Sequence, residues 1–431
     1  MKKFFQITVL IMALTTSVFA VGEAGAVWLL IKPGARAAGM GEVGGAVADD
    51  AYATYYNPSG LGFQSGRSFT VHHVNWLSNL GVQGDMYFDF LGYKQYFEDY
   101  GTIGGNITIM NLGEQWRTDA YGNKIDKFRS YYLATTGSYG TRLSRNTSFG
   151  LNFKLIYQHL TSGGAGREKG SGNSTNLALG VGYMKKEFLL DNLTLGLSIQ
   201  NIGNKITFID VEQADPMPTN LKLGLNYEIK QEYNTISFAY DINKLLVTRY
   251  PPRDLNGDGK IGGYNESGDR IGPSGEYNNK GQMEEAHTDP WYKAIFTSWV
   301  DDWFLYKNPD LDDDGKVGGW NKEGEKDPDG KYNSPETGNG AEKEVKTGSL
   351  GNELETLVHN FGIEYWYANK FAVRVGFLYD KAGDITMNGL PVPTFGTGLR
   401  YAGMRFDFGY TAGENDHPRA NTMHFSIKMN L

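Results

Sequence analysis

Two twelve-residue stretches carry the side chains best suited to bind a metal ion. They begin at Asp254 and Asp310 and read DLNGDGKIGGYN and DLDDDGKVGGWN. Oxygen-bearing side chains at positions one, three and five, glycine at six and an apolar residue at eight follow the pattern of EF-hand-type calcium loops. The expected oxygen ligands are Asp254, Asn256, Asp258 and the Lys260 carbonyl in the first copy, and Asp310, Asp312, Asp314 and the Lys316 carbonyl in the second.

The twelfth position is the weak point of both loops. EF-hand-type loops place a bidentate glutamate there, whereas these repeats have Asn265 and Asn321. Asp269 and Glu325 lie at matching offsets further along and offer the missing carboxylate. The alternative is a solvated acidic loop without metal, because Asp, Asn and Gly are also ordinary turn residues. A twelve-residue match that occurs twice favours calcium (Ca2+), and a weak site still fills at millimolar external calcium.

Both repeats lie within an acidic insert, residues 251–350. It contains 21 acidic and 12 basic residues, a net charge of −9 that leaves the rest of the chain at +1. Between the repeats, Trp291 to Tyr306 has aromatic side chains mostly three or four residues apart, which predicts a short helix with an aromatic stripe. We expect this stripe to form the small core of the insert. The alternative is a binding surface for a partner.

Other kinds of chemistry find little support in the sequence. The seven histidines are scattered, and no serine stands in a nucleophile elbow, so we expect no enzymatic activity. Cysteine is absent, which removes disulfides, thiolate metal ligands and attachment of a lipid to cysteine. Neither the insert nor the rest of the chain has the basic surplus that binding to nucleic acid requires.

The rest of the chain is built from alternating strands. From Asn421 to Leu431, apolar and polar residues alternate strictly, and the same pattern recurs near 193–200 and 221–230. Successive side chains of a strand point to opposite faces, so each such segment has one apolar and one polar face. Many strands of this kind predict an all-β fold, an antiparallel transmembrane β-barrel of the outer membrane.

The pattern predicts fourteen strands, an even number as in bacterial single-chain barrels. We place them at 67–76, 82–94, 100–110, 129–142, 146–160, 174–186, 192–201, 219–229, 233–242, 355–367, 370–379, 394–401, 404–411 and 421–431. Strands one to nine thus fall within residues 67–250, and strands ten to fourteen within residues 351–431.

The lengths of the connections give an independent test of this topology. Links after even-numbered strands are short, such as 368–369 and 402–403, whereas most links after odd-numbered strands are long, such as 111–128; the first odd link, 77–81, is the exception. Short periplasmic turns and long surface loops are typical of outer-membrane barrels. A soluble β-sandwich, the alternative for alternating strands, has no reason to sort its loops in this way. The topology places the insert at the cell surface.

The first residues predict export. Lys2 and Lys3 precede an apolar run, and Val18-Phe19-Ala20 suits signal peptidase, so we expect a signal peptide at residues 1–20 with cleavage near Ala20. The apolar run is shorter than the ~20 residues of a spanning helix, the alternative reading. Export together with amphipathic strands predicts an integral protein of the outer membrane, in contact with its lipid.

Residues 21–66 are not strand-like, and we expect them to form a plug, or hatch, inside the barrel. Their Ala- and Gly-rich composition suits close packing against the wall. The segment contains the sequence Pro33-Gly34-Ala35-Arg36-Ala37-Ala38-Gly39-Met40-Gly41, the pair Asp49-Asp50, and Asn57-Pro58.

At these residues the chain resembles the PorV/PorQ group of outer-membrane proteins, which is related to the FadL-type barrels. The resemblance rests on the hatch motif and on the amphipathic last strand. It implies a fourteen-stranded barrel with an N-terminal hatch, in which Pro33, Ala35, Arg36, Gly39, Met40, Gly41, Asn57 and Pro58 are the motif residues. The acidic insert is a departure from the group.

The resemblance also implies a role in type IX secretion. A PorV-like barrel receives secreted cargo by its C-terminal signal domain from the translocon and delivers it to surface attachment machinery that includes a sortase. The alternative is a FadL-like transporter of hydrophobic small molecules. A PorQ-like role in the same system and an outer-membrane barrel of another role are further alternatives. The sequence does not identify the cargo.

Overall fold

The computed structural model describes most of the chain. The described residues are 24–76, 86–118, 123–161, 172–208, 214–272, 275–301, 303, 309, 316–320, 326–327, 349–383, 385–387, 389–413 and 421–431. They form two compact units: a barrel unit of residues 23–246, 358–379 and 385–431, and an insert unit of residues 247–357 with 380–384. The expected signal peptide, residues 1–20, lies outside the described residues.

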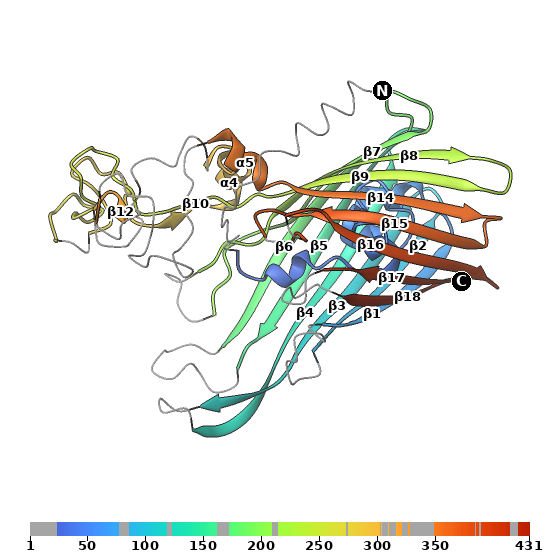
Figure 1. The fold of residues 1–431 in the computed structure, drawn as a ribbon, viewed down its shortest axis with the longest axis horizontal. Coiled ribbons are helices and arrows are strands. Elements are labelled where there is room, and N and C mark those ends of the chain that lie inside the picture. Colours follow the sequence, from blue (N-terminus) through green and yellow to red (C-terminus); the bar gives the residue numbers. More distant parts are fainter. Residues whose placement is uncertain are drawn as a thin grey trace. The chain divides into compact units, whose positions relative to one another are not determined.

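The barrel unit is a closed ring of fourteen antiparallel strands (Figure 1). The strands are β1 (Arg67–Asn75), β2 (Tyr87–Phe97), β3 (Gly101–Thr118), β4 (Lys124–Arg142), β5 (Thr147–His159), β6 (Asn173–Lys185), β7 (Leu193–Gly203), β8 (Asn220–Lys230), β9 (Thr235–Leu245), β14 (Val358–Tyr367), β15 (Phe371–Tyr379), β16 (Val392–Tyr401), β17 (Met404–Thr411) and β18 (Thr422–Asn430). The last strand closes the ring by pairing with the first, with Val71 opposite Ile427. The predicted fold and strand number are confirmed.

Three strand boundaries differ from the prediction by five residues or more. The expected loop at 111–128 is largely strand, because β3 continues to Thr118 and β4 begins at Lys124. The ladder shifts register between Asn111 and Glu114. Charged residues such as Glu114 and Arg117 break the alternation there, so the sequence pattern no longer indicated a strand. The second strand begins at Tyr87 instead of Val82.

The wall has apolar side chains on its outer face and polar side chains on its inner face, the reverse of the arrangement in a soluble β-sheet protein. On β5 the apolar side chains of Leu151 and Phe153 are 45% and 53% exposed, whereas the polar side chains of Ser148 and Asn152 are buried. The buried face also donates hydrogen bonds to residues 24–66, since Ser148 bonds to the carbonyl of Ser59. Apolar residues outside and polar residues inside are the arrangement of a barrel in lipid, and exclude the β-sandwich.

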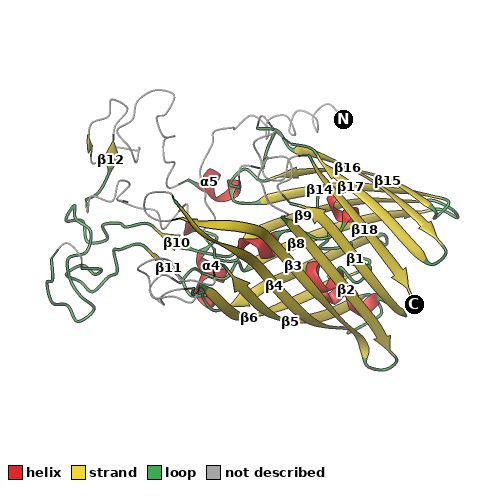
Figure 2. Cartoon of the chain, turned by 90° about the horizontal axis from the view of Figure 1, so that it is seen from below, coloured by secondary structure: helices red, strands yellow, loops and turns green. Residues whose placement is uncertain are grey.

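Inside the ring lies the hatch, which we define in the structure as residues 24–66. It contains η1 (Val27–Leu30), α2 (Ala35–Ala38), α3 (Ala53–Tyr56) and η2 (Pro58–Phe63). These short helices lie within the circle of strands (Figure 2), and they contact its two sides: η2 packs on β4, β5 and β6, whereas α2 packs on β16, β17 and β18. The hatch therefore reaches across the lumen from one side of the ring to the other.

The insert unit has little regular structure among its described residues. It contains the paired strands β10 (Arg249–Tyr250) and β11 (His287–Thr288), the paired strands β12 (Gly319–Trp320) and β13 (Lys326–Asp327), and the helices α4 (Trp291–Thr297) and α5 (Leu350–Glu355). In the described part of the chain, no helix combines the length and the apolar character needed to span a bilayer.

Candidate functional site

The hatch motif places its backbone directly against the wall. Gly34 and Gly39 flank the single turn of α2. A Cβ atom at Gly39 would lie 2.7 Å from the Cα atom of Gly396 on β16, and one at Gly376 on β15 would lie 2.1 Å from the amide nitrogen of Gly41. Atoms this close exclude any side chain, so glycines on both partners are what allow the contact.

Gly41 is the most constrained residue of the motif. Its φ of +64° is in the left-handed region. Its amide donates to the Thr394 hydroxyl at 2.8 Å, and its carbonyl accepts from Asn360 Nδ2 at 2.5 Å. A Cβ atom at this position would lie 2.4 Å from the carbonyl oxygen of Phe361 and 2.5 Å from that of Phe377. Hydrogen bonds to β14 and β16 therefore fix the backbone in a place where only glycine fits.

A buried carboxylate holds the next turn of the hatch. The amides of Gly44 and Gly45 both donate to Asp241 Oδ2 on β9, each at 2.8 Å. Asp241 is fully buried. Bonds from backbone N–H groups to a carboxylate are charge-assisted and stronger than neutral ones. Together with the contacts at Gly41, this bond ties the hatch to neighbouring strands around the ring.

Asn57 and Pro58 form the second fixed point of the hatch. The Asn57 side chain accepts from the Ser59 amide and caps η2, while its Nδ2 donates to the Gly45 carbonyl at 2.9 Å. Pro58 at the first helical position suits the start of η2, where no intrahelical amide is needed. A Cβ atom at Gly150 of β5 would lie 2.2 Å from the Pro58 carbonyl carbon, so this turn too rests against the wall.

A chain of buried ion pairs joins the hatch to one side of the ring. Arg36 makes a two-pronged contact with Glu364 on β14, with Nη2 to Oε1 at 2.7 Å and Nε to Oε2 at 2.9 Å. Its Nη1 reaches Asp49 Oδ1 at 2.6 Å. Glu364 Oε2 also accepts from Arg374 Nε on β15 at 2.7 Å. The Glu364 carboxylate thus pairs with Arg36 of the hatch and with Arg374 of the wall.

The same chain continues to a second residue of the hatch. Arg374 Nη2 lies 2.8 Å from Asp407 Oδ1 on β17, whose other oxygen accepts from Arg405 Nε at 2.7 Å. Arg405 Nη2 then reaches Asp50 Oδ2 of the hatch at 2.7 Å. We call Arg36, Asp50, Glu364, Arg374, Arg405 and Asp407 the ion-pair chain. It begins and ends in the hatch and passes through three strands.

The charges of the ion-pair chain balance. Its three arginines match its three carboxylates, and all six side chains are buried, Arg374 and Glu364 with 1% exposure each. A buried ion pair adds little net stability over an apolar pair, but removing one partner leaves an unpaired buried charge and costs roughly 3–5 kcal/mol. The chain therefore specifies one position of the hatch, because any displacement separates charges that have no access to water.

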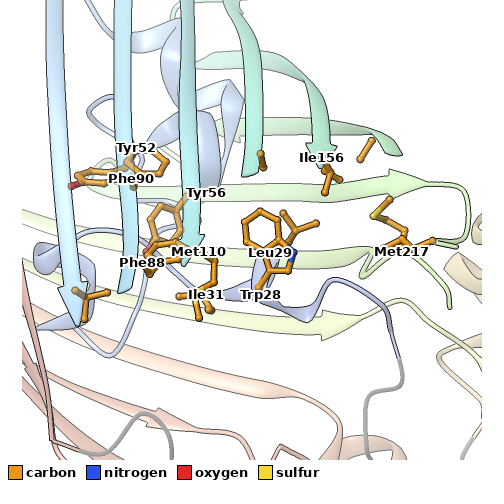
Figure 3. Close-up of a cluster of buried hydrophobic side chains, with 14 residues drawn as sticks. Trp28, Leu29, Ile31, Tyr52, Tyr56, Phe88, Phe90, Met110, Ile156 and Met217 are labelled. Carbon is orange, nitrogen blue, oxygen red and sulfur yellow. The ribbon is translucent and has the colours of Figure 1, made fainter. Parts of the chain in front are cut away.

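On the other side of the ring, the hatch packs through apolar side chains. Trp28, Leu29 and Ile31 of the hatch cluster with inward-facing residues of β1 to β6, including Phe88 and Ile156 (Figure 3). Trp28 Nε1 also donates to Gln158 Oε1 at 3.0 Å. The apolar packing in this cluster has little directionality, in contrast to the ion-pair chain.

Sequence reasoning identified the hatch motif but not its partners on the wall. All eight motif residues are buried, and several contact the wall directly: the Ala35 amide donates to the Ser426 hydroxyl, Arg36 donates to Glu364, and Gly39 packs against Gly396. The missed residues are Glu364, Arg374, Arg405 and Asp407. Their signal was present, since ionisable side chains within predicted membrane strands are rare and mark functional positions.

In the first repeat, carboxylates hold the loop through its own backbone. Asp254 Oδ1 accepts from the Gly257 amide at 2.6 Å and Oδ2 from the Gly259 amide at 2.8 Å. Asn256 Oδ1 accepts from the Asp258 amide, and Asp258 Oδ1 from the Lys260 amide, both at 2.9 Å. The three side chains thus fold back onto one tight turn, and each oxygen retains a free lone pair.

Glu284 bonds to the backbone of the first loop, rather than Asn265 or Asp269, the two residues that we predicted as ligands at the end of the repeat. Asp269 and Asn265 bond to each other in a separate turn, with the Asp269 amide donating to Asn265 Oδ1 at 2.8 Å. Glu284 is fully buried, and its Oε1 accepts from the Leu255 amide and its Oε2 from the Gly262 amide, both at 2.8 Å. Sequence reasoning missed Glu284, which lies 30 residues from Asp254.

The second repeat is described only in part. Asp310, Asp312, Asp314, Asn321 and Glu325 lie outside the described residues. Lys316 is described and forms an antiparallel bridge with Lys260, while Pro309 forms one with Arg253. In both bridges, each residue pairs with its equivalent in the other repeat. The two loops therefore meet through matching positions, as a local twofold arrangement requires.

The aromatic stripe does not form the small core that we predicted. In α4 only Ala294 is buried, whereas Tyr292 and Phe296 are 62% and 76% exposed. The helix is held instead by Asp289, which accepts hydrogen bonds from Tyr250 and from Thr297, both at 2.8 Å. Burial raises the pKa of the Asp289 carboxyl, but hydrogen bonds from its neighbours, first that from Lys293, outweigh burial and hold the pKa below its usual value.

The described residues offer no group of three or more His, Cys, Asp or Glu side chains arranged to hold a metal. The first calcium loop falls short of that number because one of its three oxygen donors is Asn256. Calcium binding therefore stays a prediction. Among the described residues, histidines make hydrogen-bonding or packing contacts, as in the stacked pair of His72 and His424. The absence of enzymatic activity also stays a prediction.

Comparison with known proteins gives one family. The family model described as "Type IX secretion system protein PorV" matches residues 18–253, which is more than half of the chain and includes the hatch and β1 to β9. Comparison with curated proteins gave no significant match.

Several solved structures of outer-membrane barrels are similar in fold. The toluene transporter TbuX of Ralstonia pickettii is 13% identical, with a TM-score of 0.43 over 92% of this chain and 96% of that chain. The toluene transporter TodX of Pseudomonas putida is 14% identical, with a TM-score of 0.42 over 96% and 98%. A FadL homologue of Pseudomonas aeruginosa is 9% identical, with a TM-score of 0.39 over 92% and 98%. These likenesses concern the fold alone.

Proposed function

The chain belongs to the PorV family of type IX secretion system proteins, and it is an integral outer-membrane barrel. From this premise we propose that it receives secreted cargo by the cargo's C-terminal signal domain and passes it to surface attachment machinery. The translocon would supply the cargo, and a sortase-type enzyme would take it over. The observation that carries this proposal is the family match, which covers the hatch and the first nine strands.

The hatch supports this role over that of an open conduit. Hydrogen bonds at Gly41, the ion-pair chain and the apolar cluster tie it to strands on both sides of the ring. A folded or unfolded protein chain needs a wide aqueous path, which a fixed hatch does not leave. We therefore infer that cargo is held at the exposed loops and rim of the barrel, while the lumen stays closed.

Deletion of the gene tests the proposal directly in the native host. The expected result is that proteins with a C-terminal signal domain are no longer attached to the cell surface, and that re-expression of the barrel restores attachment. Affinity purification of the tagged barrel in mild detergent should recover these proteins or translocon components. Normal surface attachment together with impaired uptake of a fatty acid or another hydrophobic compound would reject the proposal and favour the FadL-like transporter.

We also propose that the first repeat binds calcium and thereby fixes the insert for contact with a partner. Asp254, Asn256 and Asp258 are the side-chain donors, and the Lys260 carbonyl is the backbone donor. The donor set suits calcium because it consists of hard oxygen ligands. Glu284, rather than Asp269, is the carboxylate that sets the shape of the loop, since it holds the loop backbone at Leu255 and Gly262.

A further inference from the structure

The outward face of the wall is hollowed over β2 and β3. The hollow has a volume of about 540 Å³. It is lined by Phe69, Leu91, Gly92, Tyr93, Gln95, Phe97, Ile103, Gly104, Gly105, Asn106, Ile107, Thr135 and Thr136. None of these side chains is charged. The hollow lies on the face that carries the exposed apolar side chains of the barrel, such as Ile103 at 52% and Ile107 at 41% exposure.

Gly105 leaves one outward position of the hollow without a side chain. Along β3 the outward positions are Ile103, Gly105 and Ile107, so the middle position has no side chain. Its partner on β4 is Gly137, the next outward position after Thr135. A Cβ atom at Gly137 would meet no other atom within 4 Å. Two neighbouring outward positions are therefore empty, and large side chains surround the gap.

The lining has a polar pair, Tyr93 and Gln95, near one end of its strands. Gln95 and Tyr93 stand toward the short turn between β2 and β3, and the Tyr93 hydroxyl donates to Gln95 Oε1 at 2.8 Å. Leu91 and Ile107, which face each other across the β2–β3 ladder, lie further from that turn. Tyrosine at the end of a membrane strand is typical of the headgroup level, and aliphatic residues are typical of the hydrocarbon region.

We propose that this hollow binds one acyl chain of a phospholipid, whose headgroup lies at the level of Tyr93 and Gln95. The volume falls within the roughly 300–1,000 Å³ of ligand pockets. The hollow is continuous with the lipid-facing surface, and an empty apolar space of this size loses the packing contacts that a chain would supply. The uncharged, largely apolar lining matches a hydrocarbon tail, and the Tyr93–Gln95 pair offers polar groups to the end of the lipid nearest the turn.

Photolabelling of the full-length protein tests the proposal. The protein is reconstituted in vesicles of phosphatidylethanolamine that contain a small share of phosphatidylethanolamine with a diazirine in its acyl chain. After illumination, we expect mass spectrometry to find labels enriched on residues 91–107 relative to the equally apolar outward segments 149–155 and 371–377. An even distribution of labels over the wall would overturn the proposal.

A matched pair of variants localises the site. Thr135 and Thr397 both face outward on membrane strands, and only Thr135 lines the hollow. Thr135→Trp should abolish the enrichment, whereas Thr397→Trp should leave it unchanged. Ile107→Trp, at another outward position that lines the hollow, gives a second test if Thr135→Trp does not fold. Enrichment that survives both filling variants, or crosslinks between two copies of the chain in place of lipid labels, would contradict a lipid site.

Discussion

Two buried glutamates hold the two units of this protein in different ways. Glu364, on β14, is 1% exposed and lies between the guanidinium groups of Arg36 and Arg374. Glu284, in the insert, is fully buried and accepts hydrogen bonds from backbone amides and from Asn278. The first carboxylate is neutralised by cations of the chain. The second is satisfied by neutral donors, so its negative charge remains.

This difference shows which of the two units an external cation can stabilise. In the ion-pair chain of the barrel, three buried arginines balance three buried carboxylates. In the insert, Glu284 and Asp254 are two buried carboxylates close in space to one loop backbone, and the insert as a whole has a net charge of −9. A cation therefore gains more in the insert than in the barrel. Four predictions test this contrast, from the largest effect to the smallest.

The largest effect is expected where the hatch backbone meets the wall. Gly41→Ala would place a Cβ atom 2.4 Å from the Phe361 carbonyl oxygen and force a left-handed conformation on alanine. We expect the free energy of hatch opening, measured by native-state hydrogen exchange, to fall by more than about 4 kcal/mol. Gly66→Ala is the control: Gly66 also has a positive φ, of +62°, but no atom lies within 4 Å, so only the strain of roughly 1–2 kcal/mol remains. If Gly41→Ala and Gly66→Ala lower the free energy of hatch opening equally, the close contact of Gly41 with the wall does not stabilise the hatch.

The second prediction removes the central carboxylate of the barrel. Glu364→Ala leaves Arg36 and Arg374 buried without their shared partner, and we expect the hatch to lose roughly 3–5 kcal/mol. The matched control is Glu114→Ala, which breaks an exposed pair with Lys127 and should leave the exchange of the hatch amides unchanged. Hydrogen exchange of the hatch amides is the measurement. If Glu364→Ala changes the exchange of the hatch amides no more than Glu114→Ala does, the ion-pair chain does not hold the hatch.

The third prediction makes the corresponding change in the insert. In Glu284→Gln the new amide nitrogen cannot accept the Gly262 hydrogen bond, which leaves a buried donor unpaired. We expect the insert amides at 254–264 to lose roughly 1–3 kcal/mol of protection, while the hatch is unchanged. Glu276→Gln, at an exposed position, is the control. Unchanged exchange at 254–264 would refute the role of Glu284.

The smallest effect is that of calcium. Millimolar calcium should raise the protection of residues 254–264 in the full-length protein by about 1 kcal/mol, as expected for a ligand present at several times its Kd. The hatch amides should not respond. Asp254→Asn should remove the effect, because it deletes a carboxylate of the loop. If calcium leaves the insert of the wild-type protein unchanged, the first repeat is an acidic loop without metal.

The sequence predicted the barrel because its physical signal is local. Strict alternation marked each membrane strand, and β17 lies where it was expected, from Met404 to Thr411. Alternation failed at Thr118 and Lys124, where charged residues occupy both faces of the hairpin. The hatch motif was recognisable, but pairs such as Arg36 and Glu364 are 328 residues apart, and no local pattern specifies such a contact.

The insert was harder to predict for a related reason. The spacing predicted a helix over residues 291–306, of which α4 covers Trp291–Thr297. Such spacing does not say what covers the apolar face, and Phe296 is exposed. The residue beside the first loop, Glu284, is distant in sequence and follows no motif. Side-chain type and spacing thus identify elements, whereas the partner of a buried charge has to be found in three dimensions.

Hydrogen exchange of the hatch in the wild-type barrel tests the central claim most directly. If the wall fixes the hatch in the lumen, the amides of residues 36–57 exchange as slowly as those of β14 in the wild-type protein, in detergent and in lipid, and the Gly41→Ala and Glu364→Ala variants both accelerate them strongly. Exchange of these amides in the wild-type protein as fast as that of the insert loops would contradict the account, because the hatch would then open freely.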